Sequence, residues 1–167
     1  MHTLQGERLD GCGNADLLSN SLTAFFASRV CPALAIRAGL AWTLEQVHAG
    51  GTVVGGFHSP LERSVLNLLM EARNPVVAVL AREVASARLP VGWRVAIQQG
   101  HMAVVSQAVG RRHLDHDRST SRNDLVVRLA DRIVVAHVSE SGSLAAQVRE
   151  WRHRGKCVRL LMTIASK

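Results

Sequence analysis

The sequence predicts an α/β fold with three layers, in which a mostly parallel sheet is covered by helices on both faces. Two observations lead to this prediction. Short apolar segments alternate with segments of helical periodicity, and short turns join them. In addition, residues 76–81 are apolar on both faces, as is typical of parallel strands that helices cover on each side.

Length and composition limit the possible classes of protein. A chain of 167 residues with 47% hydrophobic residues is long enough for one domain with a real core. We expect this domain at residues 22–167, after a polar, loosely ordered arm at residues 1–21. No apolar run is long enough to span a bilayer and no signal segment is seen, so we expect a cytoplasmic protein without membrane contact.

The first elements of the domain follow from periodicity and from stop signals. Within the arm, residues 14–20 suggest one short helix. In the helix at 33–48, one face carries Leu34, Ala38, Ala41, Leu44 and Val47. The next helix ends at Asn74-Pro75. This part of the chain therefore predicts strands at 22–27, 52–55 and 76–81, with helices at 33–48 and 60–73.

The second half continues the same alternation. Residues 107–118 contain a long gap in apolar patterning and predict an exposed loop. Gly155 ends the last helix before the last strand. We expect helices at 91–99, 123–130 and 143–154, and strands at 102–106, 132–138 and 157–163.

The turn after residues 52–55 is the most informative motif. Its sequence, Gly55-Gly56-Phe57-His58-Ser59-Pro60-Leu61-Glu62, has glycines that allow a tight turn and then a well-marked helix start. Ser59 suits the N-cap, Pro60 the first helical position, and Glu62 completes a capping box. Free N–H groups at such a helix start can cradle an anion. A well-capped turn with no ligand is the alternative.

In a parallel sheet, ligands bind at the carboxyl ends of the strands, so the turns there supply the candidate site. We expect phosphate or nucleotide binding, with Arg29 and Arg122 as charge partners and Phe57 as a surface on which a base stacks. His58 could contact phosphate or hydrogen-bond the backbone. The candidate residues are Ser28, Arg29, Gly55, Gly56, Phe57, His58, Ser59, Arg122, Asn123, Ser141, Gly142 and Ser143.

Charge and missing motifs restrict the chemistry further. The net charge of +7 favours an anionic partner such as nucleic acid. Neither the P-loop pattern nor GxGxxG occurs, which disfavours ATPases and dehydrogenases. The three cysteines are far apart and lack CxxC spacing. We therefore assign no metal ligand, no cofactor and no catalytic residue, and we favour a binding protein over an enzyme.

The order of motifs resembles the Rossmann-like domain of DprA/Smf DNA-processing proteins, within the SLOG superfamily. The resemblance covers residues 22–164 and rests on Ser28-Arg29, Gly55-Gly56, Arg122-Asn123, Leu129-Ala130-Asp131 and Ser141-Gly142-Ser143-Leu144. Small stand-alone DprA-like proteins of bacteria are more similar still. Their shared motifs are Gly55 to Pro60 with Glu62, Ala81-Arg82, Leu89-Pro90 with Trp93-Arg94, and Val135-Ala136-His137.

This resemblance implies binding of single-stranded DNA or a nucleotide, a recombinase as partner, and self-association into a homo-oligomer. The chain departs from the DprA pattern after the glycines, where Phe57 to Glu62 replace small-Arg-Gly-Ile-Asp. One alternative is a nucleoside-monophosphate phosphoribohydrolase of the same superfamily. Its Pro-Gly-Gly-x-Gly-Thr-x-x-Glu loop corresponds to Ser139 to Gln147, which lacks the glycine pair and the carboxylate downstream of it. Another alternative is a sensor of a nucleotide signal.

Overall fold

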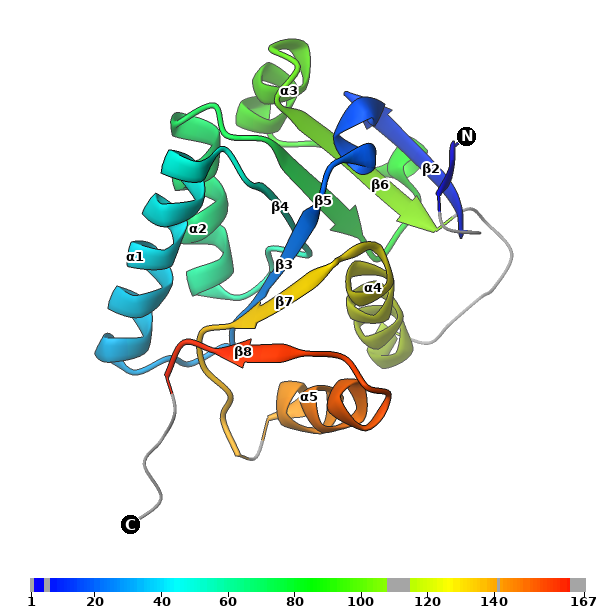
Figure 1. Ribbon diagram of the computed structural model, residues 1–167. Helices are drawn as coiled ribbons and strands as arrows, with labels where there is room; N and C mark the ends of the chain where they lie inside the picture. Colours follow the sequence, from blue (N-terminus) through cyan, green and yellow to red (C-terminus); the bar gives the residue numbers. More distant parts are fainter. Residues whose placement is uncertain (1, 5–6, 108–114, 141, 163–167) are drawn as a thin grey trace.

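The structure is a computed structural model that describes residues 2–4, 7–107, 115–140 and 142–162. Its centre is a sheet of eight strands in the order β1-β2-β6-β5-β4-β3-β7-β8 (Figure 1). β1 and β2 pair antiparallel, as do β2 and β6, and every other pairing is parallel. The strands are β1 (His2–Leu4), β2 (Glu7–Gly13), β3 (Leu22–Phe26), β4 (Thr52–Gly55), β5 (Val76–Leu80), β6 (Met102–Gln107), β7 (Arg132–Val135) and β8 (Val158–Leu160).

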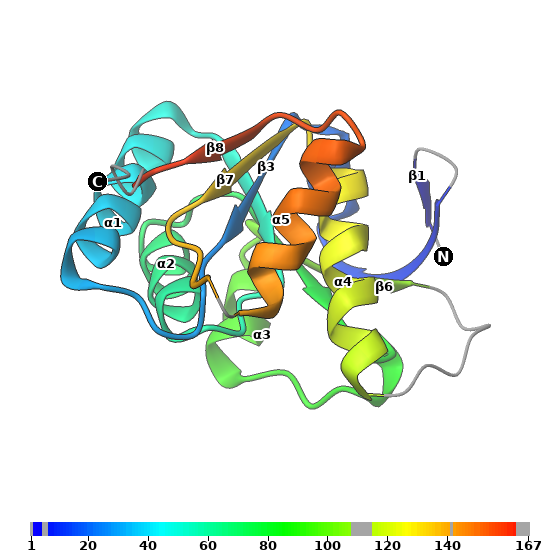
Figure 2. The ribbon, with the colours of Figure 1, turned by 90° about the horizontal axis from the view of Figure 1, so that it is seen from below.

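Helices cover both faces of this sheet (Figures 1 and 2). One face carries α1 (Ala33–Ala49), α2 (Pro60–Glu71) and α3 (Val91–Gln98), and the other carries α4 (Asp115–Leu129) and α5 (Ser143–His153). Two short 3-10 helices, η1 (Ala15–Ser19) and η2 (Val84–Ser86), complete the described elements. The predicted three-layer α/β fold with a mostly parallel sheet is confirmed.

Strand alternation divides the core between the two faces. In β3, Phe25 stacks on Trp42 of α1, with ring centroids 4.9 Å apart, while Phe26 contacts Trp151 of α5 at 4.7 Å. Adjacent strand residues point to opposite faces, so one strand anchors a helix on each side. Two separate clusters of buried apolar residues result, one beneath α1 to α3 and one beneath α4 and α5.

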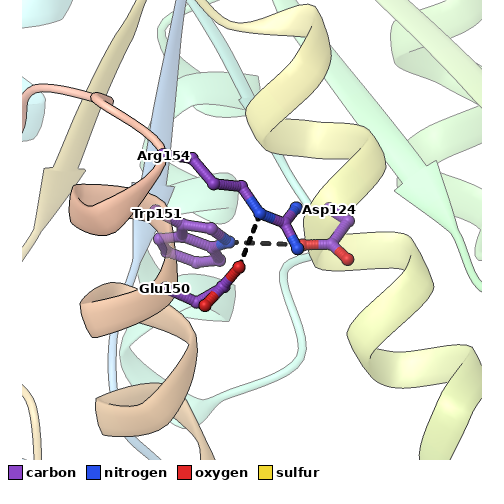
Figure 3. A network of polar contacts seen from close by, with 4 residues as sticks. All are labelled: Asp124, Glu150, Trp151 and Arg154. Atoms are coloured by element: carbon purple, nitrogen blue, oxygen red, sulfur yellow. Dashed lines mark hydrogen bonds and ion pairs between the residues drawn. The ribbon is translucent and has the colours of Figure 1, made fainter.

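Polar contacts connect the helices of the second face (Figure 3). The Trp151 indole N–H donates to Asp124 Oδ1 of α4 at 3.3 Å. On the exposed side of α5, Arg154 Nε donates to Glu150 Oε1 at 2.7 Å. The buried indole thereby keeps a hydrogen-bond partner while its ring fills the core.

The first residues of the chain differ from the expected loose arm. β2 pairs with β6 from Leu9 to Gly13, and Leu9 is fully buried in the core. The predicted short helix is present as η1. Periodicity could not reveal β2 because its sequence, Glu-Arg-Leu-Asp-Gly-Cys-Gly, has no apolar alternation and Leu9 is its one buried apolar residue.

The start of α4 is the other clear difference. This helix begins at Asp115, inside the segment predicted as a loop, and not near residue 123. Residues 108–114 of that loop lie outside the described residues. In the first turns of α4, Ser119, Thr120 and Ser121 are exposed or half-buried, so an apolar pattern could not reveal them. None of the helices in the described part of the chain is long and apolar enough to cross a membrane.

Candidate functional site

A pocket of ≈580 Å³ lies at the carboxyl ends of β3, β4 and β7. The starts of α2 and α5 and residues 119–123 in the middle of α4 complete its walls. The lining residues are Phe26, Ala27, Ser28, Arg29, Val30, His58, Ser59, Glu62, Ser119, Thr120, Arg122, Asn123, Ser139, Gly142, Ser143, Leu144 and Gln147. Most of the predicted site residues therefore come together here.

Ser28 and Arg29 follow directly after β3. The Ser28 side chain is buried, and its Oγ accepts a hydrogen bond from the Ser139 N–H at 2.8 Å. The Ser28 N–H donates to the carbonyl of His137 at 3.0 Å. These bonds join the ends of β3 and β7, and they leave the exposed Arg29 at the pocket wall.

The helix start at α2 encloses a carboxylate of the chain itself. Glu62 Oε1 accepts from the Ala27 N–H at 3.0 Å, and Oε2 accepts from the N–H groups of His58 and Ser59 at 2.8 and 3.2 Å. The predicted capping box with Ser59 is confirmed. In this structure, however, these N–H groups do not cradle a phosphate, because Glu62 already occupies the anion position.

Glu62 is almost completely buried, with 6% of its surface exposed. Burial raises the pKa of its carboxyl, while the three N–H donors and the nearby Arg122 oppose that rise. The carboxylate links the turn after β3 to the start of α2. Its first role is therefore to hold the pocket wall together.

Arg122 reaches the pocket from the middle of α4, whereas the sequence predicts it at a helix start. Only 7% of its surface is exposed. The Nε and Nη2 atoms donate to Asn123 Oδ1 at 3.3 and 3.1 Å. Asn123 Nδ2 donates in turn to Gln147 Oε1 at 2.8 Å, which connects α4 to α5. Burial lowers the pKa of Arg122 and Glu62 raises it, but an arginine in a protein stays charged.

Gly56 makes room for this guanidinium. A Cβ atom at Gly56 would lie 2.5 Å from Arg122 Nε and 3.0 Å from its Cζ. Real Cβ atoms essentially never come that close to another heavy atom. The second glycine of the motif thus serves the approach of an arginine side chain, which the sequence alone could not reveal.

Phe57 does not offer a stacking surface, in contrast to the prediction. Its side chain is 4% exposed and belongs to the core beneath α1 to α3. The backbone at Phe57 has a φ of 52°, which turns the ring inward, and a Cβ at Gly55 would lie 3.1 Å from this ring. Gly55 and Phe57 therefore shape the turn without lining the pocket.

His58 lies at the pocket beside several cations. Burial and the positive charges of Arg122, Arg63 and Arg82 all lower the pKa of its imidazole. His58 is therefore neutral near pH 7 in the unliganded protein.

The remaining predicted residues lie at α5. Gly142 is its N-cap and has no side chain that could cap the helix, and Ser143 is the first helical residue. Both line the pocket, whereas Ser141 lies outside the described residues. Sequence reasoning did not name Ser119, Thr120, Ser139 and Gln147 as site residues, and it assigned Glu62 to the capping box. The resemblance had placed Ser139 and Gln147 in the right segment, but it did not mark them as pocket residues.

Comparison with known proteins gives a fold and no sequence family. Neither a family model nor a curated protein matches the sequence. Among solved structures, DNA processing protein A from Helicobacter pylori, described with its single-stranded DNA binding mode, has a TM-score of 0.74 at 15% identity. The match covers 95% of this chain and 74% of that one.

Two further structures extend this comparison. DprA from Streptococcus pneumoniae has a TM-score of 0.73 at 17% identity, over 95% of this chain and 56% of its own. The molybdenum cofactor binding protein from Rippkaea orientalis has a TM-score of 0.59 at 10% identity, over 84% of this chain and 76% of its own. The chain thus has a DprA-like fold, as the resemblance implied, and spans only part of each DprA.

Proposed function

We propose that the pocket binds phosphate groups of nucleic acid, with single-stranded DNA as the ligand that best fits its charge and position. The observation that carries this proposal is the buried Arg122 guanidinium in the pocket lining. A buried cation is costly unless negative charge compensates it, and the chain places Gly56 and Asn123 so that Arg122 is held there.

Glu62 does not fully satisfy this arginine. Both carboxylate oxygens accept backbone N–H groups, two of them from the start of α2. The positive end of the α2 dipole therefore compensates part of the Glu62 charge. The remaining field of Arg122, together with the exposed Arg29, favours an added anion in the pocket. Guanidinium groups bind phosphate with two parallel hydrogen bonds, which adds geometric preference to the charge.

The similar structures support this choice of ligand. The H. pylori protein is described with its single-stranded DNA binding mode, and the R. orientalis protein is a molybdenum cofactor binding protein. A single nucleotide is the smaller ligand that the same pocket would accept. Self-association and contact with a recombinase stay predictions that rest on the resemblance.

The test compares Arg122→Gln and Arg29→Gln with the parent protein in binding a fluorescent twelve-residue oligothymidylate by anisotropy. Loss of a charge-assisted hydrogen bond costs about 1.5–3 kcal/mol, so we expect Arg122→Gln to weaken binding at least about tenfold. Arg132→Gln is the matched control. Arg132 is exposed and lies at the amino end of β7, whereas the pocket lies at the carboxyl ends of the strands. Equal binding by the parent and Arg122→Gln would place the site elsewhere.

A phosphoribohydrolase activity is the second candidate, favoured by one observation: the Glu62 carboxylate lines the pocket. Cleavage of a glycosidic bond requires a carboxylate that can stabilise positive charge on the sugar or transfer a proton. Both carboxylate oxygens of Glu62 accept backbone N–H groups. Gln147 has an amide in place of a carboxylate, and its Oε1 accepts a hydrogen bond from Asn123. We therefore expect AMP and other nucleoside monophosphates to stay intact in the presence of the protein. Free base that disappears with Glu62→Gln, while folding is retained, would favour the enzyme.

A further inference from the structure

Two exposed arginines lie beyond the pocket at the same edge of the sheet. Arg63 is in the first turns of α2, and Arg82 follows the end of β5. We call His58, Arg63 and Arg82 the β5-side patch. β5, β4 and β3 are parallel neighbours, so their carboxyl ends follow one another along this edge. The patch thus continues from the pocket toward β5.

Electrostatics supports this arrangement. Burial lowers the pKa of the His58 imidazole. The positive charges of Arg122 in the pocket and of Arg63 and Arg82 outside it lower this pKa further. One side chain therefore lies within the field of the pocket cation and of both outer cations. Two acidic residues are close to this patch in sequence. Glu62 is buried and accepts backbone N–H groups, and the exposed Glu83 follows Arg82.

Fold stability does not explain the position of Arg63. A cation near the amino end of a helix is disfavoured by the helix dipole, and the exposed Arg63 follows directly after the capping box of α2. A phosphate next to the exposed Arg63 guanidinium would offset this cost, because it would compensate the positive charge directly.

We propose that a DNA strand seated at Arg122 continues over the start of α2 to Arg82, so that the protein binds a strand segment and not a single nucleotide. This inference rests on the proposed function of the pocket. Neighbouring strands are about 4.8 Å apart, so the ends of β3 and β5 are separated by roughly 10 Å. At about 3.4 Å or more per nucleotide along a strand, this distance corresponds to about three nucleotides or fewer.

The experiment measures binding of dTMP, dT3 and dT12 by Arg63→Gln/Arg82→Gln, by Arg122→Gln and by the Arg132→Gln control, at several salt concentrations. In the parent protein, affinity should rise from dTMP to dT3. The double variant should lose most of this rise while it binds dTMP like the parent. Each lost phosphate contact on a single strand reduces the slope of log K against log salt by about 0.7, so the double variant should lose about 1.4 from its dT12 slope.

The outcomes separate the patch from the pocket. Unchanged dT3 and dT12 binding in the double variant, alongside weak binding by Arg122→Gln, would refute the path over α2 and leave the pocket assignment in place. Equal losses in Arg132→Gln would also refute it, because the effect would then come from net charge. If Arg122→Gln binds all three ligands like the parent, the pocket assignment itself fails and the path fails with it. Thermal unfolding midpoints show whether each of these variants folds, including Arg122→Gln at its buried position.

Discussion

At the scale of single residues, Glu62 and Arg122 determine what the pocket can bind. The carboxylate fills the anion position that the glycine turn would otherwise offer, because it accepts the N–H groups of His58 and Ser59. A ligand phosphate must then be held by the arginines and by the start of α5. The partial positive charge at the start of α2 is thus compensated by Glu62 of the chain itself. The guanidinium groups provide the positive charge for the ligand.

Gly56→Ala tests whether the position of Arg122 matters, without changing any charge. The new Cβ would lie 2.5 Å from Arg122 Nε, so the side chain must move away from its place at the pocket. Gly56 does not have a positive φ, and alanine therefore fits its backbone. We expect about a tenfold loss of oligothymidylate affinity, as for a lost charge-assisted hydrogen bond.

Gly92→Ala in α3 is the control for this variant, because a Cβ at Gly92 meets nothing within 4 Å. Its affinity for the oligonucleotide should equal that of the parent in the same anisotropy titration. Full binding by Gly56→Ala, with a correctly folded chain, would contradict the role given to Arg122.

Glu62→Gln addresses the buried carboxylate through the pH dependence of stability. The glutamine amide cannot accept at both of its terminal atoms, so at least one of the three N–H groups loses its partner. We expect a loss of about 1–3 kcal/mol in the free energy of unfolding, measured in urea.

The sign of the pH effect follows from the raised pKa of Glu62 in the folded state. The unfolded chain titrates near the ordinary value of about 4.3, so the native state holds more protons between that value and the raised pKa. Stability contributed by Glu62 is therefore fully present below about pH 4.3 and falls as the pH rises through the folded pKa. The parent should show this decline relative to Glu62→Gln. An advantage of the parent that grows with pH would mean that the N–H donors and Arg122 outweigh burial.

At the scale of elements, the amino end of α2 depends on its capping box. Ser59 Oγ accepts from the Glu62 N–H at 3.2 Å, and removal of an N-cap hydroxyl costs about 1 kcal/mol. Ser59→Ala should lower the free energy of unfolding by about that amount in urea denaturation. Ser64→Ala is the control, since the exposed Ser64 Oγ donates to the Pro60 carbonyl within the same helix and caps nothing. Equal losses in the two variants would show that the cap has no special role.

The elements also show how far the sequence could predict the fold and the site. Strong apolar periodicity and stop signals located β3 to β7 and α1, α2, α3 and α5 to within a few residues. β2 was missed because Leu9 alone carries its burial, and the start of α4 was missed because its first turns are polar. Acidic residues at Asp115 and Asp117 in the first turn of α4 were the signal available for that start.

For the site, strand polarity predicted which turns meet, and the pocket includes Ser28, Arg29, His58 and Gly142 from those turns, whereas Arg122 comes from the middle of α4. The sequence could not tell whether the N–H groups of the glycine turn face a ligand or a carboxylate of the chain. It also could not tell that Phe57 turns into the core, because a positive φ at a phenylalanine has no sequence signal of its own. Side-chain direction at a turn depends on tertiary contacts, which local patterns do not contain.

At the scale of the whole molecule, the net charge of +7 and the recessed position of Arg122 predict different behaviour toward two forms of DNA. Any polyanion is attracted to the basic surface, but only a flexible strand can bring a backbone phosphate to a guanidinium that is 7% exposed. A duplex would have to unpair and unstack a nucleotide to do so, at a cost of a few kcal/mol.

A twelve-residue single strand should therefore bind at least about tenfold more tightly than a duplex of the same length. Arg122→Gln should weaken binding of the single strand and leave duplex binding unchanged in the same anisotropy titrations, while added salt weakens both. Equal sensitivity of the two forms to Arg122→Gln would mean that DNA lies over the pocket mouth and does not enter it.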